Sequence, residues 1–299
     1  MKKLFKQLFP RLYTRRQEWK RRRKERSLFK QKLLTIQCGD FEIMAPENHP
    51  LFRKQKEQPY YDLGIGIAAK YLSTKYPEGT MVDIGANIGD TAAVIATYAK
   101  NRLVLVEASD YYFGILSQNA RRIPNILAVK NVLISDGGDL TGVLQHWGGT
   151  ASFHEKAGAG PQQKSQRLSD VADATTCFVK IDTDGFDFKI LRSSLSWLQE
   201  VRPGCLFECQ IGTPAELVEA DVLCAELQAA GYLYFTVWDD RGFHLVSTNS
   251  LGVLHDLNRY LLNNMTQHGH RAVSYYDVLC LHQKDEEVHH NIRDWYRSR

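Results

Sequence analysis

The chain lacks several features that would assign it to a class of protein at once. Its six cysteines form no Cys-x-x-Cys pair, so the usual pattern of a zinc site or a dithiol redox centre is missing. No apolar run reaches the roughly twenty residues that a membrane-spanning helix needs. The short apolar pairs near the N-terminus are interrupted by Lys6 and Gln7, which leaves no signal-peptide core. These absences predict a cytoplasmic protein with buried, reduced thiols.

Acidic residues are scarce in the first 32 residues, which hold fourteen Lys and Arg against Glu18 and Glu25, a net charge of +12. The other 267 residues carry −8, so the basic character belongs to this segment. Trp19 and Phe29 lie among the basic side chains, a mixture that suits an anionic membrane surface. The same composition suits nucleic acid. We predict a helical arm that is either solvated or in peripheral contact with a membrane, in preference to a nucleic-acid binder.

The most informative stretch is the glycine turn Met81–Asp90, MVDIGANIGD. An apolar run ends in Asp83, two glycines four residues apart follow, and residues 91–99 read as a helix. Such a turn lets the backbone approach a ligand at the carboxyl end of a strand. A dinucleotide turn would read Gly-x-Gly-x-x-Gly, and a carboxylate at Asp83 would repel its pyrophosphate. The turn therefore favours a cationic ligand such as S-adenosylmethionine, with a nicotinamide-dependent oxidoreductase as the alternative.

Predicted strands and helices alternate after this turn. Strands are expected at residues 102–107, 126–134, 176–181, 205–208, 232–238 and 276–281. Helices are expected at residues 112–123, 188–198 and 213–230, the last with a capping box at Thr213 and Glu216. Repeated strand–helix units indicate an α/β fold with a doubly wound, mainly parallel, seven-stranded Rossmann-like sheet.

Four segments are expected along the chain. They are a basic helical arm at 1–32, a β-hairpin and helix at 33–79, the sheet domain at 80–285 and a C-terminal tail at 286–299. Within the sheet domain, residues 139–166 are rich in Gly, Gln and Ser. We expect them to form a long loop with a short strand above the site.

Acidic residues end four of the predicted strands, at Asp83, Glu107, Asp182 and Glu208. Because the carboxyl ends of parallel strands share one edge of a sheet, these side chains should converge on one cleft. Glu107 follows Asp83 by 24 residues and can accept both hydroxyls of a ribose, although a helix-capping role is also open. Asp182 shares a strand face with Lys180, as a catalytic or a structural pair. His154 is a further candidate base.

Taken together, these segments resemble the FkbM family of S-adenosylmethionine-dependent methyltransferases, which have the class I methyltransferase fold. The matching segments are Val82–Asp90, Val106-Glu107-Ala108, Gly149-Thr150-Ala151-Ser152, Arg167-Leu168-Ser169-Asp170 and Lys180–Gly185. The resemblance covers residues 80–235 and implies O-methylation of a hydroxyl on a macrolide, a sugar or a related compound. The sequence departs from the family at Asp184, where many members have Glu, and at residues 186–188, where smaller residues are usual. These departures concern the acceptor pocket.

The expected site combines these positions. Catalytic roles are expected for Asp182, Lys180 and Glu208. Cofactor contacts are expected for Asp83, Gly85, Ala86, Asn87, Gly89, Asp90, Glu107, Ala108, Ser135 and Asp136. Acid clusters also bind Mg²⁺, but the sequence assigns no metal ligand. The expected acceptor is a sugar or glycan hydroxyl, as in surface polysaccharide. A non-catalytic membrane- or nucleic-acid-binding protein remains the alternative from another class.

Overall fold

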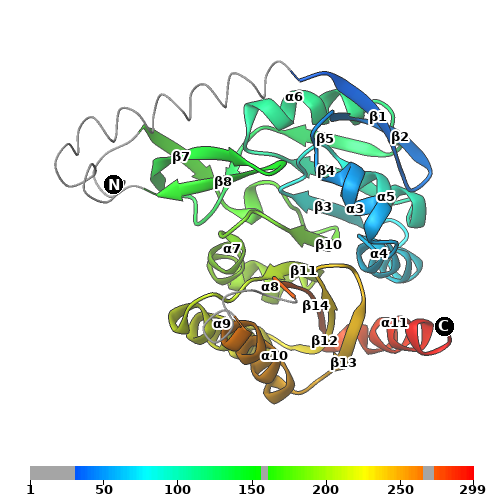
Figure 1. Ribbon diagram of the computed structural model, residues 1–299. Helices are drawn as coiled ribbons and strands as arrows, with labels where there is room; N and C mark the ends of the chain where they lie inside the picture. Colours follow the sequence, from blue (N-terminus) through cyan, green and yellow to red (C-terminus); the bar gives the residue numbers. More distant parts are fainter. Residues whose placement is uncertain (1–30, 156–160, 265–272) are drawn as a thin grey trace.

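The computed structural model describes residues 31–155, 161–264 and 273–299 (Figure 1). The basic arm expected at residues 1–32 lies almost wholly outside these residues. Within them, no helix combines the length and the apolar character needed to cross a membrane. All six cysteines are buried thiols, as predicted.

An eight-stranded sheet, in the order β13-β12-β14-β11-β10-β3-β4-β5, forms the centre of the molecule. The strands are β3 (Thr80–Ile84), β4 (Arg102–Val106), β5 (Ile126–Lys130), β10 (Thr176–Ile181), β11 (Gly204–Cys209), β12 (Tyr232–Asp239), β13 (His244–Thr248) and β14 (Tyr276–His282). The five strands from β5 to β11 run parallel, and β14 is antiparallel to both of its neighbours. The predicted doubly wound, mainly parallel sheet is confirmed, with β13 as an additional edge strand.

The order of the strands reverses at the centre of this sheet. From β3 the chain continues outward to β4 and β5, and then returns to the other side of β3 as β10. In open α/β sheets such a switch point leaves a crevice at the carboxyl ends of the strands, where ligands bind. The glycine turn after β3 and the acidic residues after β10 therefore lie on the two sides of one crevice.

Helices cover both faces of the sheet, as Figure 1 shows for α4 and α5 on one side and α7 and α9 on the other. One face carries α4 (Leu63–Lys75), α5 (Asp90–Tyr98), α6 (Asp110–Asn119) and α11 (Glu286–Arg297). The other carries α7 (Asp187–Ser193), α8 (Leu195–Val201), α9 (Pro214–Ala229) and α10 (Leu251–Asn263). Because side chains alternate along a strand, β3 sends Val82 and Ile84 into one core and Met81 into the other.

The predicted N-terminal hairpin is present as β1 (Leu33–Cys38) and β2 (Phe41–Pro46), and it is followed by α3 (Leu51–Glu57). It packs into the same core as α4 and α5. The side-chain amide of Asn119 on α6 donates to the Met44 carbonyl and accepts from the Met44 amide, both at 2.8 Å. Residues 33–79 are thus built into the main domain.

The structure corrects the long loop predicted at residues 139–166. These residues form β7 (Asp139–Trp147), β8 (Thr150–Glu155) and β9 (Gln162–Gln166), which join β6 (Leu133–Ile134) in a small four-stranded sheet. The strand predicted at 126–134 is accordingly divided between β5 in the large sheet and β6 in the small one. These strands were not predicted because the segment is mostly polar and buries only a few side chains, among them Leu140 and Phe153.

The C-terminal tail expected at residues 286–299 is also corrected, because most of it is helix α11. Val288 and Ile292, one helical turn apart, are buried on the core that α4 and α5 share. Two short 3-10 helices, η1 (Leu168–Asp170) and η3 (Gln283–Asp285), complete the regular structure of the described residues.

Candidate active site

The glycine turn after β3 packs directly against the end of β10. Gly85 has φ +78°, and a Cβ at this position would collide with the backbone carbonyl of Asp182. The amides of Gly85 and Ala86 both donate to the Val106 carbonyl at 2.9 Å, which ties the turn to β4. Gly89, at φ +90°, starts α5. These glycines are needed because the backbone adopts left-handed conformations where three strand ends meet.

A buried ion pair joins the two sides of the crevice. The Nζ of Lys180 on β10 lies 3.1 Å from Oδ1 of Asp83 and 3.4 Å from Oδ2 of Asp182. Burial raises the pKa of Asp83, while Lys180 and the hydroxyl of Thr91 oppose that rise. Burial also disfavours the charge on Lys180, but Asp83 and Asp182 outweigh it and hold the lysine pKa well above its usual value. Asp83 is therefore an anchor for Lys180 and does not reach the crevice.

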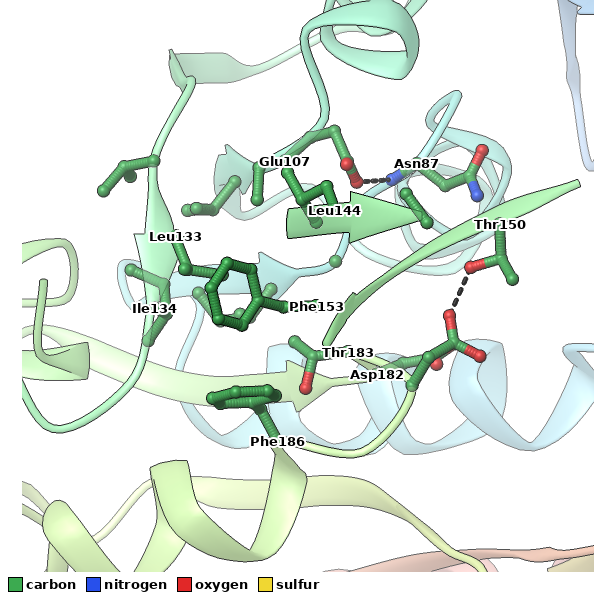
Figure 2. Close-up of a pocket in the computed structure, with 17 residues that line it drawn as sticks. Asn87, Glu107, Leu133, Ile134, Leu144, Thr150, Phe153, Asp182, Thr183 and Phe186 are labelled. Carbon is green, nitrogen blue, oxygen red and sulfur yellow. Dashed lines mark hydrogen bonds between the residues drawn. The ribbon is translucent and has the colours of Figure 1, made fainter. Parts of the chain in front are cut away.

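Glu107 directly follows β4, and backbone amides donate to both of its carboxylate oxygens. One oxygen accepts from the amide of Asn87 at 2.9 Å (Figure 2). The other accepts from the amide of Ser109 at 2.7 Å. Burial raises the pKa of Glu107 to about 7, against these two hydrogen bonds, which lower it. The carboxylate is fixed in one orientation, and each of its oxygens keeps a lone pair for a further donor.

The β7–β8 hairpin closes over this crevice. At its tip, the carbonyl of Gly149 accepts from Nδ2 of Asn87 at 2.9 Å and faces Nε2 of His49 at 3.0 Å. Since Nδ1 of His49 accepts from the Leu51 amide, Nε2 is the nitrogen that carries the proton. The hydroxyl of Thr150 donates to Asp184, which follows β10 (Figure 2). Three side chains thus fasten the hairpin tip across the crevice.

Two cavities lie on either side of this tip. The first, of about 40 Å³, runs beneath the hairpin from Glu107 to the apolar side chains Leu133, Ile134, Phe153 and Phe186 (Figure 2). The second, of about 300 Å³, lies between α3 and the ends of β10 and β11. Both are lined by Gly85, Asn87, Thr150, Asp182 and Asp184, so they meet at the hairpin tip.

Several carboxyl groups lie in or next to the second cavity. Burial raises the pKa of Glu208 well above its usual value, and the charges of Asp182 and Asp187 add to this effect. Asp277 faces Glu208 across the β11–β14 pair, and burial, together with Asp182, raises its pKa to about 7. Among these acids, the side chain of Asp182 is 43% exposed and lies against Lys180. Asp182 is therefore an accessible carboxylate beside buried acids whose pKa is raised.

The structure brings together most of the residues expected from the sequence. Asp90, Glu208, Lys180 and Asp182 line the second cavity, Glu107 and Ala108 the first. The other expected residues do not line either cavity. Asp83 lies in β3, Ala86 and Gly89 belong to the glycine turn, and Ser135 is buried. Asp136 pairs with Lys189 at 3.5 Å on the surface, and His154 is exposed beside Ser152.

Several lining residues escaped the sequence analysis. His49, Lys54 and Tyr61 come from the segment at residues 33–79, which was expected only to lead into the sheet domain, and Tyr275 precedes β14. Asp277 could have been found from the strand register, because pairing β14 with β11 places it opposite Glu208. Within the described residues, no group of three or more His, Cys, Asp or Glu side chains is arranged to hold a metal ion.

No family model and no curated protein matches this chain. Among solved structures it is similar to methyltransferase FkbM from Methylobacillus flagellatus KT, at 17% sequence identity and a TM-score of 0.40. That likeness covers 57% of this chain and 43% of the other, so this chain spans less than half the length of that protein.

Two further solved structures cover more of the chain. TYW2 of M. jannaschii in complex with AdoMet shares 12% identity at a TM-score of 0.38, over 84% of this chain and 86% of that one. Precorrin-6y C5,15-methyltransferase from Geobacter metallireducens GS-15 shares 14% identity at a TM-score of 0.36, over 72% and 87% of the respective chains. The first and third of these proteins are named as methyltransferases, and the second is in complex with AdoMet. The first also carries the name of the family that the sequence motifs resemble.

Proposed function

We propose that this chain is an S-adenosylmethionine-dependent methyltransferase that methylates a hydroxyl of a sugar or glycan. The observation that carries the proposal is the position of Glu107. Its carboxylate is fixed by two backbone amides at the edge of a glycine turn, and Asp182 and Glu208 line a second cavity that begins at the same turn. This arrangement supports a nucleoside site in the first cavity and an acceptor site in the second.

The residues of the first cavity suit the nucleoside part of the cofactor. The free lone pairs of Glu107 can accept two ribose hydroxyls, and the apolar end around Phe153 and Phe186 can hold an adenine ring. A site for such a ligand has roughly 300–1,000 Å³, against about 40 Å³ here. The hairpin must therefore move outward to admit it.

The turn disfavours a dinucleotide for a reason other than the one expected from the sequence. Asp83 is neutralised by Lys180 and lies away from the cavities. Asp90, Asp182 and Asp184 line the cavity around the turn instead, and their charges would oppose a pyrophosphate. The same charges favour the ammonium and sulfonium groups of S-adenosylmethionine.

For this reaction the protein has to align the acceptor hydroxyl with the methyl group and to remove one proton. When bound, the cofactor supplies a methyl group activated by its sulfonium. We infer that Asp182 accepts the proton of the acceptor hydroxyl as that oxygen takes the methyl group and the carbon–sulfur bond breaks. Lys180 orients Asp182 from a buried position. Glu208, whose raised pKa favours the protonated form, can donate a hydrogen bond to the acceptor.

A sugar suits the second cavity because carboxyl and hydroxyl groups surround it, among them Asp182, Glu208 and Tyr275. We further propose that the basic residues at 1–32 bring the enzyme to an anionic membrane surface, where surface polysaccharide is assembled. Their net charge of +12 and interspersed aromatic side chains support this placement.

Calorimetry with S-adenosylmethionine and, in parallel, NAD⁺ tests the cofactor. We expect binding of the first and none of the second, and the reverse result would make the protein an oxidoreductase. The acceptor is tested by incubating the enzyme with labelled methyl donor and the glycan precursors of the producing cell. Label in an alkali-stable ether of a sugar supports the proposal, and label in RNA or protein contradicts it.

A further inference from the structure

Lys54 on α3 faces the second cavity across from its acidic wall. Its Nζ donates to the hydroxyl of Tyr61 at 2.9 Å and lies 4.2 Å from the centre of the Tyr61 ring. The cavity lining places it opposite Asp182 and Glu208, with Gly85 and Asn87 of the glycine turn between them. A cation outside the glycine-turn motif thus reaches the same space as the turn.

The three cations that line this cavity are not equivalent. Lys180 is paired with Asp83 and Asp182 inside the protein. Arg53 points outward, with its side chain 73% exposed and 3.8 Å from Glu57. Lys54 forms no ion pair within 4.0 Å among the residues that the structure describes. It is therefore a partly buried ammonium available to an anion in the cavity.

The positive charge of Lys54 acts on carboxyl groups on the other side of the cavity. It lowers the pKa of Asp184 and of Asp277, although burial raises both by more. One wall of the cavity is therefore acidic and the other carries a single ammonium. An α-amino acid group has the complementary pattern, with an ammonium and a carboxylate on one carbon.

We propose that Lys54 binds the α-carboxylate of the methionine part of the cofactor, while Asp90 and Asp184, the other aspartates of this cavity, receive its ammonium. This inference rests on the proposed function. With the nucleoside held between Glu107 and Phe153, the amino acid end must leave the first cavity through the opening that Gly85, Asn87 and Thr150 line. That opening leads into the space between Asp182 and Lys54. Lys54 is accordingly a cofactor-binding residue from a segment that carries no methyltransferase motif.

Two ligands separate this role from a general effect on the site. S-adenosylhomocysteine carries the amino acid group, and 5′-methylthioadenosine carries the same nucleoside and sulfur without it. Lys54→Gln removes the charge but keeps a donor for the Tyr61 hydroxyl, and Lys54→Arg keeps the charge. Lys56→Gln is the matched control, because Lys56 lies on the same helix, is exposed and does not line the cavity.

Calorimetry of the full chain should show that Lys54→Gln weakens S-adenosylhomocysteine about tenfold or more, the size of a lost hydrogen bond to a charged group. Its affinity for 5′-methylthioadenosine should stay within about twofold. Lys54→Arg should retain most of the affinity for S-adenosylhomocysteine, and Lys56→Gln should bind both ligands like wild type.

Other outcomes overturn the inference in distinguishable ways. If Lys54→Gln weakened the binding of both ligands equally, Lys54 would maintain the shape of the cavity and would not contact the carboxylate. Unchanged binding of S-adenosylhomocysteine, with a raised KM for the acceptor, would assign it to the acceptor. If wild type bound neither ligand, the cofactor assignment itself would fail, and the inference with it.

Discussion

The ammonium of Lys180 lies 3.1 Å from Oδ1 of Asp83, and the two side chains are only 3% and 0% exposed. The same nitrogen lies 3.3 Å from the carbonyl oxygen of Gly85, to which it donates. One buried cation thus links the end of β10 to the strand and to the turn on the other side of the switch point. The geometry of Asp182, its third partner, depends on this link.

Replacing Lys180 should lower the free energy of unfolding of the whole protein. Lys180→Met leaves Asp83 buried without its counterion, and breaking a buried pair in this way costs about 3–5 kcal/mol. Chemical denaturation measures the loss. Lys189→Met is the control, because its partners Asp136 and Glu155 lie on the surface, and it should cost less than about 1 kcal/mol. Similar losses in the two variants would mean that the buried pair is not a structural link.

Glu107 predicts a pH dependence of cofactor binding. Its pKa of about 7 in the free protein means that a growing fraction carries a proton as the pH falls below 7. Since the protonated form loses an acceptor for the ribose hydroxyls, affinity for S-adenosylhomocysteine should rise from pH 6 to 8 and level off above. Glu107→Gln should bind tens- to a hundredfold more weakly, a loss of roughly 2–3 kcal/mol, with no such rise.

Asp136→Asn is the matched control for Glu107. The sequence placed Asp136 at the cofactor, but the structure places it on the surface beside Lys189. Its variant should follow the wild-type profile in both affinity and pH dependence. Loss of cofactor affinity in Asp136→Asn would mean that the cofactor extends beyond the first cavity, toward the end of β6.

The sequence predicted those parts of the site that follow from strand ends. Gly85, Glu107 and Asp182 come directly after buried apolar runs, and parallel pairing alone brings such positions to one edge. Contacts between segments far apart in the chain could not be predicted from the sequence. The carbonyl of Gly149 meets Asn87 and His49 from 62 and 100 residues away, and no local pattern encodes such distances. Nor could strand ends alone reveal that Asp83 points inward to Lys180.

The hydroxyl of Thr150 should slow cofactor release. It holds the hairpin tip to Asp184, and the hairpin has to open for a ligand to leave the first cavity. Thr150→Val keeps the shape and removes the donor, so S-adenosylhomocysteine should dissociate about tenfold faster in stopped-flow measurements. Ser152→Ala on the same strand is the control, since its partner His154 is exposed. A wild-type dissociation rate in Thr150→Val would mean that opening of the hairpin tip does not limit cofactor release.

The basic residues at the N-terminus should act separately from the site. A chain without residues 1–30 should bind S-adenosylhomocysteine like the full chain. Flotation with vesicles that contain anionic lipid should be lost in the shorter chain, and salt should weaken it in the full chain. Equal flotation of both would contradict the membrane proposal. Retention of only the full chain on nucleic acid would favour the alternative partner.

The last prediction concerns the proton of the acceptor hydroxyl. Asp182 and Asp184 are the two carboxylates where the cavities meet. Asp184 accepts from the Thr150 hydroxyl, whereas Asp182 is oriented by Lys180. Asp182→Asn should keep cofactor affinity within a few-fold and lower turnover at least about a hundredfold, the usual size of a general-base effect. Glu208→Gln should be milder, because a protonated Glu208 and a glutamine both donate a hydrogen bond. Near-normal turnover in Asp182→Asn, with a large loss in Glu208→Gln, would transfer the role of base to Glu208. Recovery of either variant with added Mg²⁺ or Mn²⁺ would mean that a metal ion activates the hydroxyl.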